Sequence, residues 1–126
     1  MASSPHWLVV IACWLVASGC GTTQAEGRGS EAPTLTAVTP DGVAIHGQVY
    51  GRNLGSGAPL VLLFHQAGAN GRGEYADLAA WLTGEGIRAI AWDLRAGGGT
   101  FGSANRTVAG LPAGTPTGFC DASADV

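Results

Sequence analysis

The sequence predicts an α/β fold, and three patterns in the chain support this prediction. Two β-rich runs lie on either side of the turn signal Asp41-Gly42, which is typical of a hairpin. An unbroken apolar run, LVLLF at residues 60–64, leads into a helical pattern, and a second apolar run, IRAIAW at residues 87–92, follows it. A strand, a helix and a strand within about 35 residues predict a βαβ unit with parallel strands and a right-handed crossover.

The hairpin is predicted from the runs at residues 34–38 and 43–51. The second run alternates between an apolar side and a more polar side, as in an antiparallel pair at a sheet edge with one face half in water. The apolar side carries Val43, Ile45, Gly47 and Val49, and the other side carries Ala44, His46, Gln48 and Tyr50. Residues 52–59 are predicted to form a loop.

The strand at residues 60–64 has no alternation, which predicts burial on both of its faces. The helix after it should bury one face and end near two glycines. That face carries Tyr75, Leu78, Ala79 and Leu82, and the glycines are Gly84 and Gly86. Residues 94–118 are predicted to be a loop of about 25 residues, and residues 119–126 to open a helix with Asp121 as its cap.

The N-terminus predicts export of the chain. Residues 7–18 form an apolar run that is too short to span a bilayer and fits the core of a signal peptide. The residues around Cys20 (ASGCG) resemble the lipobox of bacterial lipoproteins, in which this cysteine is lipidated. We therefore predict a signal peptide at residues 1–20, a flexible tether at 21–33 and a folded domain at 34–126. The resemblance implies a bacterial envelope protein held at the membrane by lipid on Cys20. An unlipidated secreted form and a cytosolic form remain alternatives.

The composition narrows the possible partners. The chain has 126 residues, enough for one domain, and its net charge is −3 with six arginines and no lysine. No basic patch for nucleic acid is present. Once Cys13 leaves with the signal and Cys20 carries lipid, Cys120 is a single thiol without a disulfide partner. The three histidines are scattered, so we predict no metal site and no cofactor.

Two short motifs follow the two predicted parallel strands. His65-Gln66-Ala67-Gly68 comes after the first strand, and Asp93-Leu94-Arg95-Ala96-Gly97 comes after the second. With the preceding hairpin, this order resembles the N-terminal part of the α/β-hydrolase fold, nearest to its dienelactone-hydrolase-like and esterase- or peptidase-like branches. In that family a His-Gly turn follows the third strand, and a D-x-R-G turn follows the fourth. Here Gln66 replaces the usual glycine, and Ala96 precedes Gly97.

The resemblance implies hydrolysis of an ester, lactone or amide through an acyl-enzyme, with a small acyl compound as substrate. Backbone N–H groups after the third strand would stabilise the oxyanion, and the matching donor here is Ala67 or Gln66. The resemblance gives His65 and Gly68 a role in bracing this loop, and makes Asp93 and Arg95 a bracing ion pair. His65 is not expected to be the catalytic base, which comes late in such chains.

The residues for acyl transfer are missing from the sequence. No G-x-S-x-G or G-x-C-x-G motif occurs, and neither Ser103, Ser123 nor Cys120 follows a strand. We therefore expect an N-terminal fragment that ends before its nucleophile, serine or cysteine, and also lacks the acid and the base. The apolar run at residues 60–64 supports this expectation, because it is patterned for a larger sheet.

Two other functions remain open. Residues 97–102 (GGGTFG) satisfy the dinucleotide-binding pattern G-x-G-x-x-G after a strand, with Asp121 about 20 residues further on. A loop with a proline follows this pattern in place of the required helix, so the match is weak. The other alternative is a non-catalytic lipoprotein with a binding or structural domain.

Overall fold

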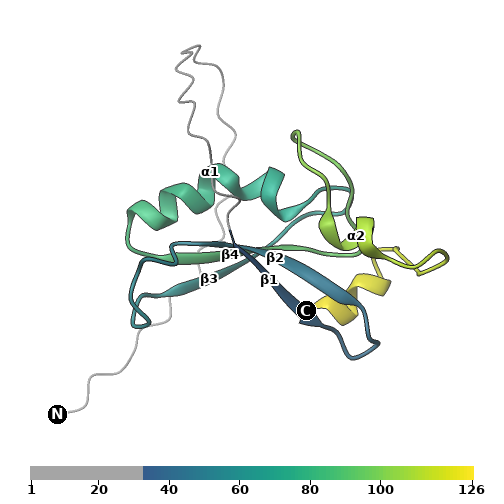
Figure 1. Ribbon diagram of the computed structural model, residues 1–126. Helices are drawn as coiled ribbons and strands as arrows, with labels where there is room; N and C mark the ends of the chain where they lie inside the picture. Colours follow the sequence, from purple (N-terminus) through teal and green to yellow (C-terminus); the bar gives the residue numbers. More distant parts are fainter. Residues whose placement is uncertain (1–32) are drawn as a thin grey trace.

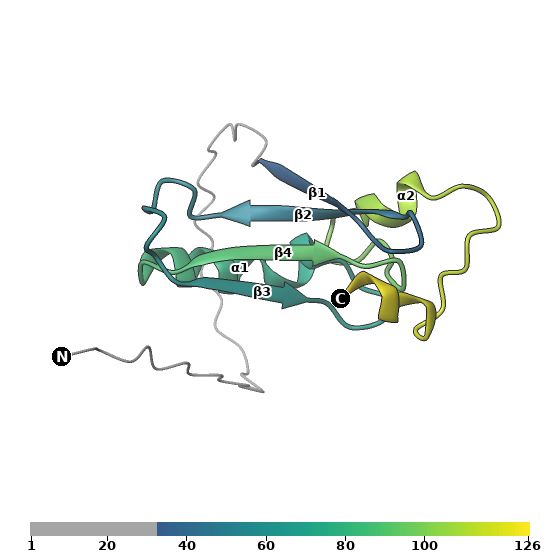
Figure 2. The same ribbon diagram turned by 90° about the horizontal axis from the view of Figure 1, so that it is seen from below.

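A computed structural model describes residues 33–126, in which one helix packs on a twisted four-stranded sheet (Figures 1 and 2). The predicted signal peptide, Cys20 and nearly all of the tether lie outside the described residues. The elements in chain order are β1 (Thr34–Val38), β2 (Ala44–Tyr50), β3 (Leu60–Phe64), α1 (Gly71–Gly84), β4 (Arg88–Asp93), α2 (Arg106–Gly110) and the 3-10 helix η1 (Asp121–Asp125).

The sheet confirms the α/β class, with strand order β1-β2-β4-β3. Strands β3 and β4 are parallel neighbours joined through α1, as predicted for the βαβ unit. Strands β1 and β2 form the predicted antiparallel hairpin, and Gly42 takes a positive φ of 84° at its turn. Of the two hairpin strands, only β1 is at a sheet edge, because β2 also pairs antiparallel with β4.

Helix α1 begins and ends close to the predicted positions. Asn70 caps its N-terminus, and Gly86, two residues after its last residue, has a positive φ of 77°. Ala79 and Leu82 are buried as predicted, but Leu78 is 41% exposed, because it lies about 100° around the helix from the buried Ala79. The buried helix residues pack with Ala89 and the inward side chains of β3.

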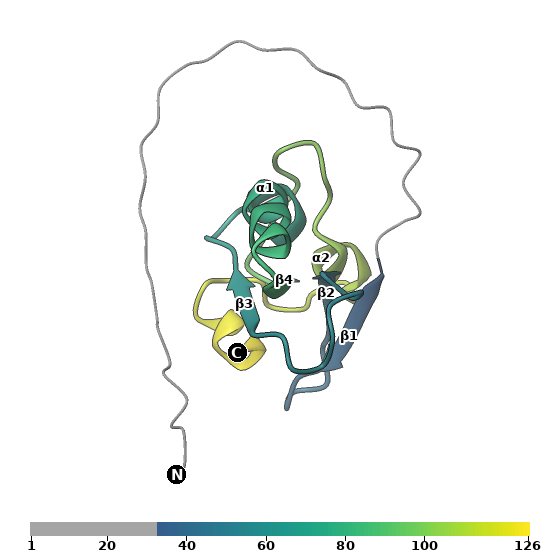
Figure 3. The same cartoon turned by 90° about the vertical axis from the view of Figure 1, so that its left-hand side faces the viewer.

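The prediction that β3 is buried on both faces is wrong for the described residues. The strand lies at the sheet edge, and its burial alternates along its length. Leu60, Leu62 and Phe64 are 48%, 49% and 38% exposed, because α1 covers only the opposite face (Figure 3). The central strand is β4, which has neighbours on both sides.

The C-terminal residues cover one end of the other sheet face. Ala122 of η1 packs with Ile45, Trp92 and Leu94 in a second small core. Asp121 is the first residue of η1 and not its N-cap, which corrects the prediction; the N-cap is Cys120, which makes no side-chain capping bond. The predicted loop at residues 94–118 contains the short helix α2, which the sequence analysis missed. Within residues 33–126, no helix has the length and hydropathy needed to cross a membrane.

Candidate functional site

The two motifs meet at the carboxyl ends of β3 and β4, where their loops bond directly to each other. The backbone N–H of Gly68 donates to the carbonyl of Ala96 at 2.8 Å, and that of Gly98 donates to the carbonyl of Ala69 at 2.7 Å. We call this contact between residues 65–70 and 94–105 the loop junction. Because β3 and β4 are parallel, both loops lie at the same end of the sheet, as the order of the motifs in the sequence implied.

His65 is 6% exposed and spans the loop junction. Its Nδ1 lies 2.7 Å from the carbonyl oxygen of Gln66, and its Nε2 lies 2.8 Å from the backbone nitrogen of Leu94. These partners assign the neutral tautomer, with Nδ1–H donating and Nε2 accepting. Both ring nitrogens are therefore engaged, and this ring braces two loops rather than offering a free base.

Asp93 joins the starts of both helices. Its Oδ1 accepts the backbone N–H of Gly71 and its Oδ2 accepts that of Arg106, each at 2.8 Å. The side chain is buried, with 4% exposure for the residue. A carboxylate at this position satisfies helix N–H groups and interacts favourably with two helix dipoles.

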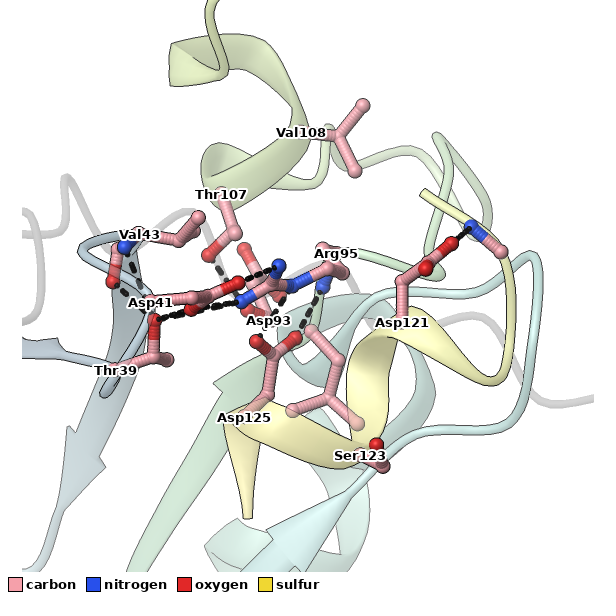
Figure 4. Close-up of polar contacts among 12 residues, drawn as sticks. Thr39, Asp41, Val43, Asp93, Arg95, Thr107, Val108, Asp121, Ser123 and Asp125 are labelled. Atoms are coloured by element: carbon pink, nitrogen blue, oxygen red, sulfur yellow. Dashed lines mark hydrogen bonds and ion pairs between the residues drawn. The ribbon is translucent and has the colours of Figure 1, made fainter. Parts of the chain in front are cut away.

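The predicted ion pair between Asp93 and Arg95 is not formed. Arg95 pairs with Asp41 of the hairpin turn at 2.5 Å and with Asp125 of η1 at 2.8 Å (Figure 4). Both oxygens of Asp93 already accept helix N–H groups. Arg95 therefore connects the hairpin to the C-terminal turn, and Asp125 also accepts its backbone N–H at 2.8 Å.

The charges in this network stabilise one another. Hydrogen bonds from Arg95 and Thr39 hold the pKa of Asp41 well below its usual range. The Asp41 carboxylate raises the pKa of the Arg95 guanidinium, with a smaller contribution from Asp125. Asp41 and Arg95 are therefore both ionised throughout the neutral pH range.

Asn70 is a site residue that the sequence analysis missed, and it is fully buried at 0% exposure. Its Oδ1 accepts the N–H of Gly73 at 2.7 Å and the hydroxyl of Ser103 at 2.6 Å. Its Nδ2 donates to the carbonyls of Thr100 and Ser103, each at 3.0 Å. The signal available in the sequence was an asparagine directly before a helical pattern.

Asn105 is the second missed residue and plays the same part for α2. Its Oδ1 accepts the N–H of Val108 at 2.9 Å, and its Nδ2 donates to the carbonyl of Leu94 at 2.9 Å. The same Nδ2 lies 3.4 Å from Nε2 of His65. The two asparagines thus fasten residues 97–105 to the loop after β3.

The turn after β3 leaves one exposed backbone donor unused. The N–H of Gln66 donates to Oε2 of Glu74 at 3.2 Å, and that of Ala69 donates to the carbonyl of Gln66 at 3.1 Å. Gly68 donates across the loop junction with a positive φ of 85°. Among the residues that the structure describes, the N–H of Ala67 has no partner, and Ala67 is exposed.

The glycine run serves close packing at the loop junction. A Cβ on Gly97 would lie 2.0 Å from Nδ2 of Asn105, and one on Gly98 would lie 2.8 Å from the carbonyl oxygen of Gly68. Phe101 and Gly102 form a tight turn with φ of 53° and 72°. No helix begins at Gly102, so the phosphate-binding helix N-terminus of a dinucleotide fold is not formed at this run.

The described residues hold no activated nucleophile and no metal cluster. Ser103 donates its hydroxyl to Asn70, and Ser123 donates its hydroxyl to the carbonyl of Cys120 at 2.8 Å. Cys120 is an exposed thiol next to η1. Residues 33–126 contain no group of three or more potential metal-ligating side chains.

Comparisons of the chain with protein-family models, with curated proteins and with solved structures find no match.

Proposed function

We propose that this chain is the N-terminal part of an exported α/β-hydrolase and that the loop junction supplies half of its oxyanion hole. The reaction would be hydrolysis of a small ester, lactone or amide through an acyl-enzyme. The observation that carries the proposal is the exposed, unpartnered N–H of Ala67 on a braced turn at the carboxyl ends of two parallel strands.

Ala67 is the better candidate than Gln66 for the donor. An oxyanion needs a preorganised N–H group that no protein acceptor already occupies. The N–H of Gln66 is bound by Glu74, whereas that of Ala67 is open to a ligand. The contacts of His65 and Gly68 hold this turn in place.

The remaining catalytic groups would come from residues beyond those of this chain. We propose that the nucleophile, serine or cysteine, lies within about 40 codons after residue 126, with the acid and base further on. The lipid on Cys20 would hold the enzyme at the envelope membrane, on its periplasmic or external side.

Reading the genomic DNA past codon 126 in all three forward frames is the first test. A G-x-S-x-G or G-x-C-x-G motif followed by aspartate and histidine codons would support the proposal. Immediate closure of the frame, with no such coding in any frame, would contradict it. The 126-residue chain alone should match buffer in a p-nitrophenyl acetate assay, because it has no activated nucleophile.

The longer enzyme allows a direct test of Ala67. Ala67→Pro removes the N–H, and we expect kcat to fall about 10²- to 10³-fold. Gln66→Ala keeps its backbone N–H and is the matched control, with kcat expected within about twofold of wild type. Circular dichroism of each variant shows whether the fold is retained. Equal kcat for a folded Ala67→Pro enzyme would exclude this donor.

A non-catalytic binding domain is the second candidate function. The observation that favours it is a groove that does not involve the turn with Ala67, formed beside the hairpin turn and Arg95. The first test separates the two functions, since a closed reading frame leaves binding as the remaining role.

A further inference from the structure

A cavity of about 550 Å³ lies beside the hairpin turn. It is lined by residues 41–44 and His46 and by residues of the segment 110–116. Arg95 and Asp121 complete the lining. We call this cavity the hairpin groove; its volume lies in the range of small-molecule sites.

The fixed charge in the hairpin groove is negative. Asp41 and Asp121 line it, and Figure 4 shows them on opposite sides of Arg95. The Arg95 side chain is only 3% exposed, and its guanidinium is held by Asp41 and Asp125. The lining side chains, two carboxylates and one buried guanidinium, carry a formal charge of −1, so an anion meets repulsion and no exposed cation.

The hairpin groove also offers unused acceptors. Oδ2 of Asp121 accepts the N–H of Gly118 at 2.8 Å, while its Oδ1 has no partner within residues 33–126. The Asp41 side chain is 47% exposed and remains ionised beside Arg95. His46 uses Nδ1 toward the hydroxyl of Thr36 at 3.2 Å and leaves Nε2 without a partner in the described part of the chain.

The side chains that line the hairpin groove fit an organic cation better than a bare metal ion. Val43, Leu111, Pro112 and Pro116 give the hairpin groove apolar surface next to its carboxylates. The described residues include no cluster of three ligands for a metal ion. A compact apolar body with one ammonium group matches both the walls and the charge.

We propose that the hairpin groove binds a small organic cation, with a primary ammonium group at Asp121 and an apolar body against residues 111–116. This site is separate from the proposed hydrolysis, because it does not use Ala67 or the turn after β3.

Three probes of similar size and different charge test the proposal on the 126-residue chain by ¹H–¹⁵N NMR. Benzylammonium should give saturable shifts at the amides of Gly42, Leu111 and Thr115, with a Kd of about 1 mM. Benzyl alcohol and benzoate should bind at least about fivefold more weakly, since they lack the positive charge.

Asp121→Asn keeps an oxygen for the N–H of Gly118 and removes the charge, so benzylammonium should bind about threefold to fivefold more weakly. Asp77→Asn, on the exposed side of α1, is the matched control and should leave the Kd unchanged. Equal binding of benzyl alcohol, no saturable shift with benzylammonium, or an unchanged Kd in a folded Asp121→Asn chain would each overturn the proposal.

Discussion

The loop junction and the outer edge of β3 lie next to each other in the chain, yet they are stabilised in opposite ways. At the loop junction, the buried side chains of His65, Asn70 and Asp93 each satisfy several backbone groups. At the edge, Leu60 and Leu62 are about half exposed, and α1 covers only the opposite face. Hydrogen bonds hold the loop junction in one geometry. Burial of the outer edge of β3, in contrast, depends on whether another strand or chain packs beside it.

Asp93→Asn is expected to have the largest effect, because it removes hydrogen bonds on which the loop junction depends. The amide keeps one acceptor, so one buried helix N–H of Gly71 or Arg106 loses its partner and faces an NH₂ group. We expect the free energy of unfolding to fall by about 3 kcal/mol. Urea denaturation followed by circular dichroism measures the change.

Asp77→Asn on the exposed side of α1 is the control for Asp93→Asn and should change stability by less than about 0.5 kcal/mol. Similar losses in the two variants would mean that Asp93 does not organise the helix starts.

Gly97→Ala tests the close approach of the two loops. The added Cβ would meet Nδ2 of Asn105 at 2.0 Å and the carbonyl oxygen of Ala69 at 2.4 Å. We expect a loss of about 2 kcal/mol, because the loops must move apart. Gly84→Ala in the last turn of α1 has open space and should be neutral or stabilising by about 0.5 kcal/mol. Thermal unfolding of both variants checks this: a lower melting temperature for Gly97→Ala and an equal or higher one for Gly84→Ala would show that the loss comes from close packing and not from replacing glycine in general.

The hairpin turn provides a pH-dependent test of the Arg95 network. Arg95 and Thr39 depress the pKa of folded Asp41, so its contribution is fully present above the unfolded value of about 3.9. That contribution is lost as the pH falls through the lower folded pKa. The stability difference between wild type and Asp41→Asn should therefore be constant from about pH 8 to pH 5 and shrink below about pH 4.

Urea titrations of wild type and Asp41→Asn at several pH values give this difference. A difference that grows on acidification would contradict the ionised pairing of Asp41 with Arg95.

The sequence predicted the elements whose signals are local. The Asp41-Gly42 turn, the parallel strands around α1 and the end of α1 near Gly84 were correct. The two motifs that follow β3 and β4 were also placed correctly, next to each other at the carboxyl ends of these strands. These features depend on turn chemistry, periodicity and the direction of parallel strands.

The remaining features depend on distant partners. Arg95 was paired with its near neighbour Asp93, but its partners are Asp41, 54 residues earlier, and Asp125, 30 residues later. The roles of Asn70 and Asn105 require the loop fold that they stabilise. Burial on both faces of β3 was inferred from an apolar run, which cannot report the number of neighbouring strands.

The smallest expected effect on stability is at the edge of β3. Leu62 is 49% exposed, so Leu62→Thr should change the free energy of unfolding by less than about 0.5 kcal/mol. Leu63→Ala, one residue further on the strand, removes contacts with the α1 core and should cost about 2 kcal/mol. Exposed apolar edges promote association between chains, so Leu62→Thr should also reduce self-association in sedimentation velocity. If Leu62→Thr proves as destabilising as Leu63→Ala at low protein concentration, the outer face of β3 is covered in solution, and the contrast with the loop junction fails.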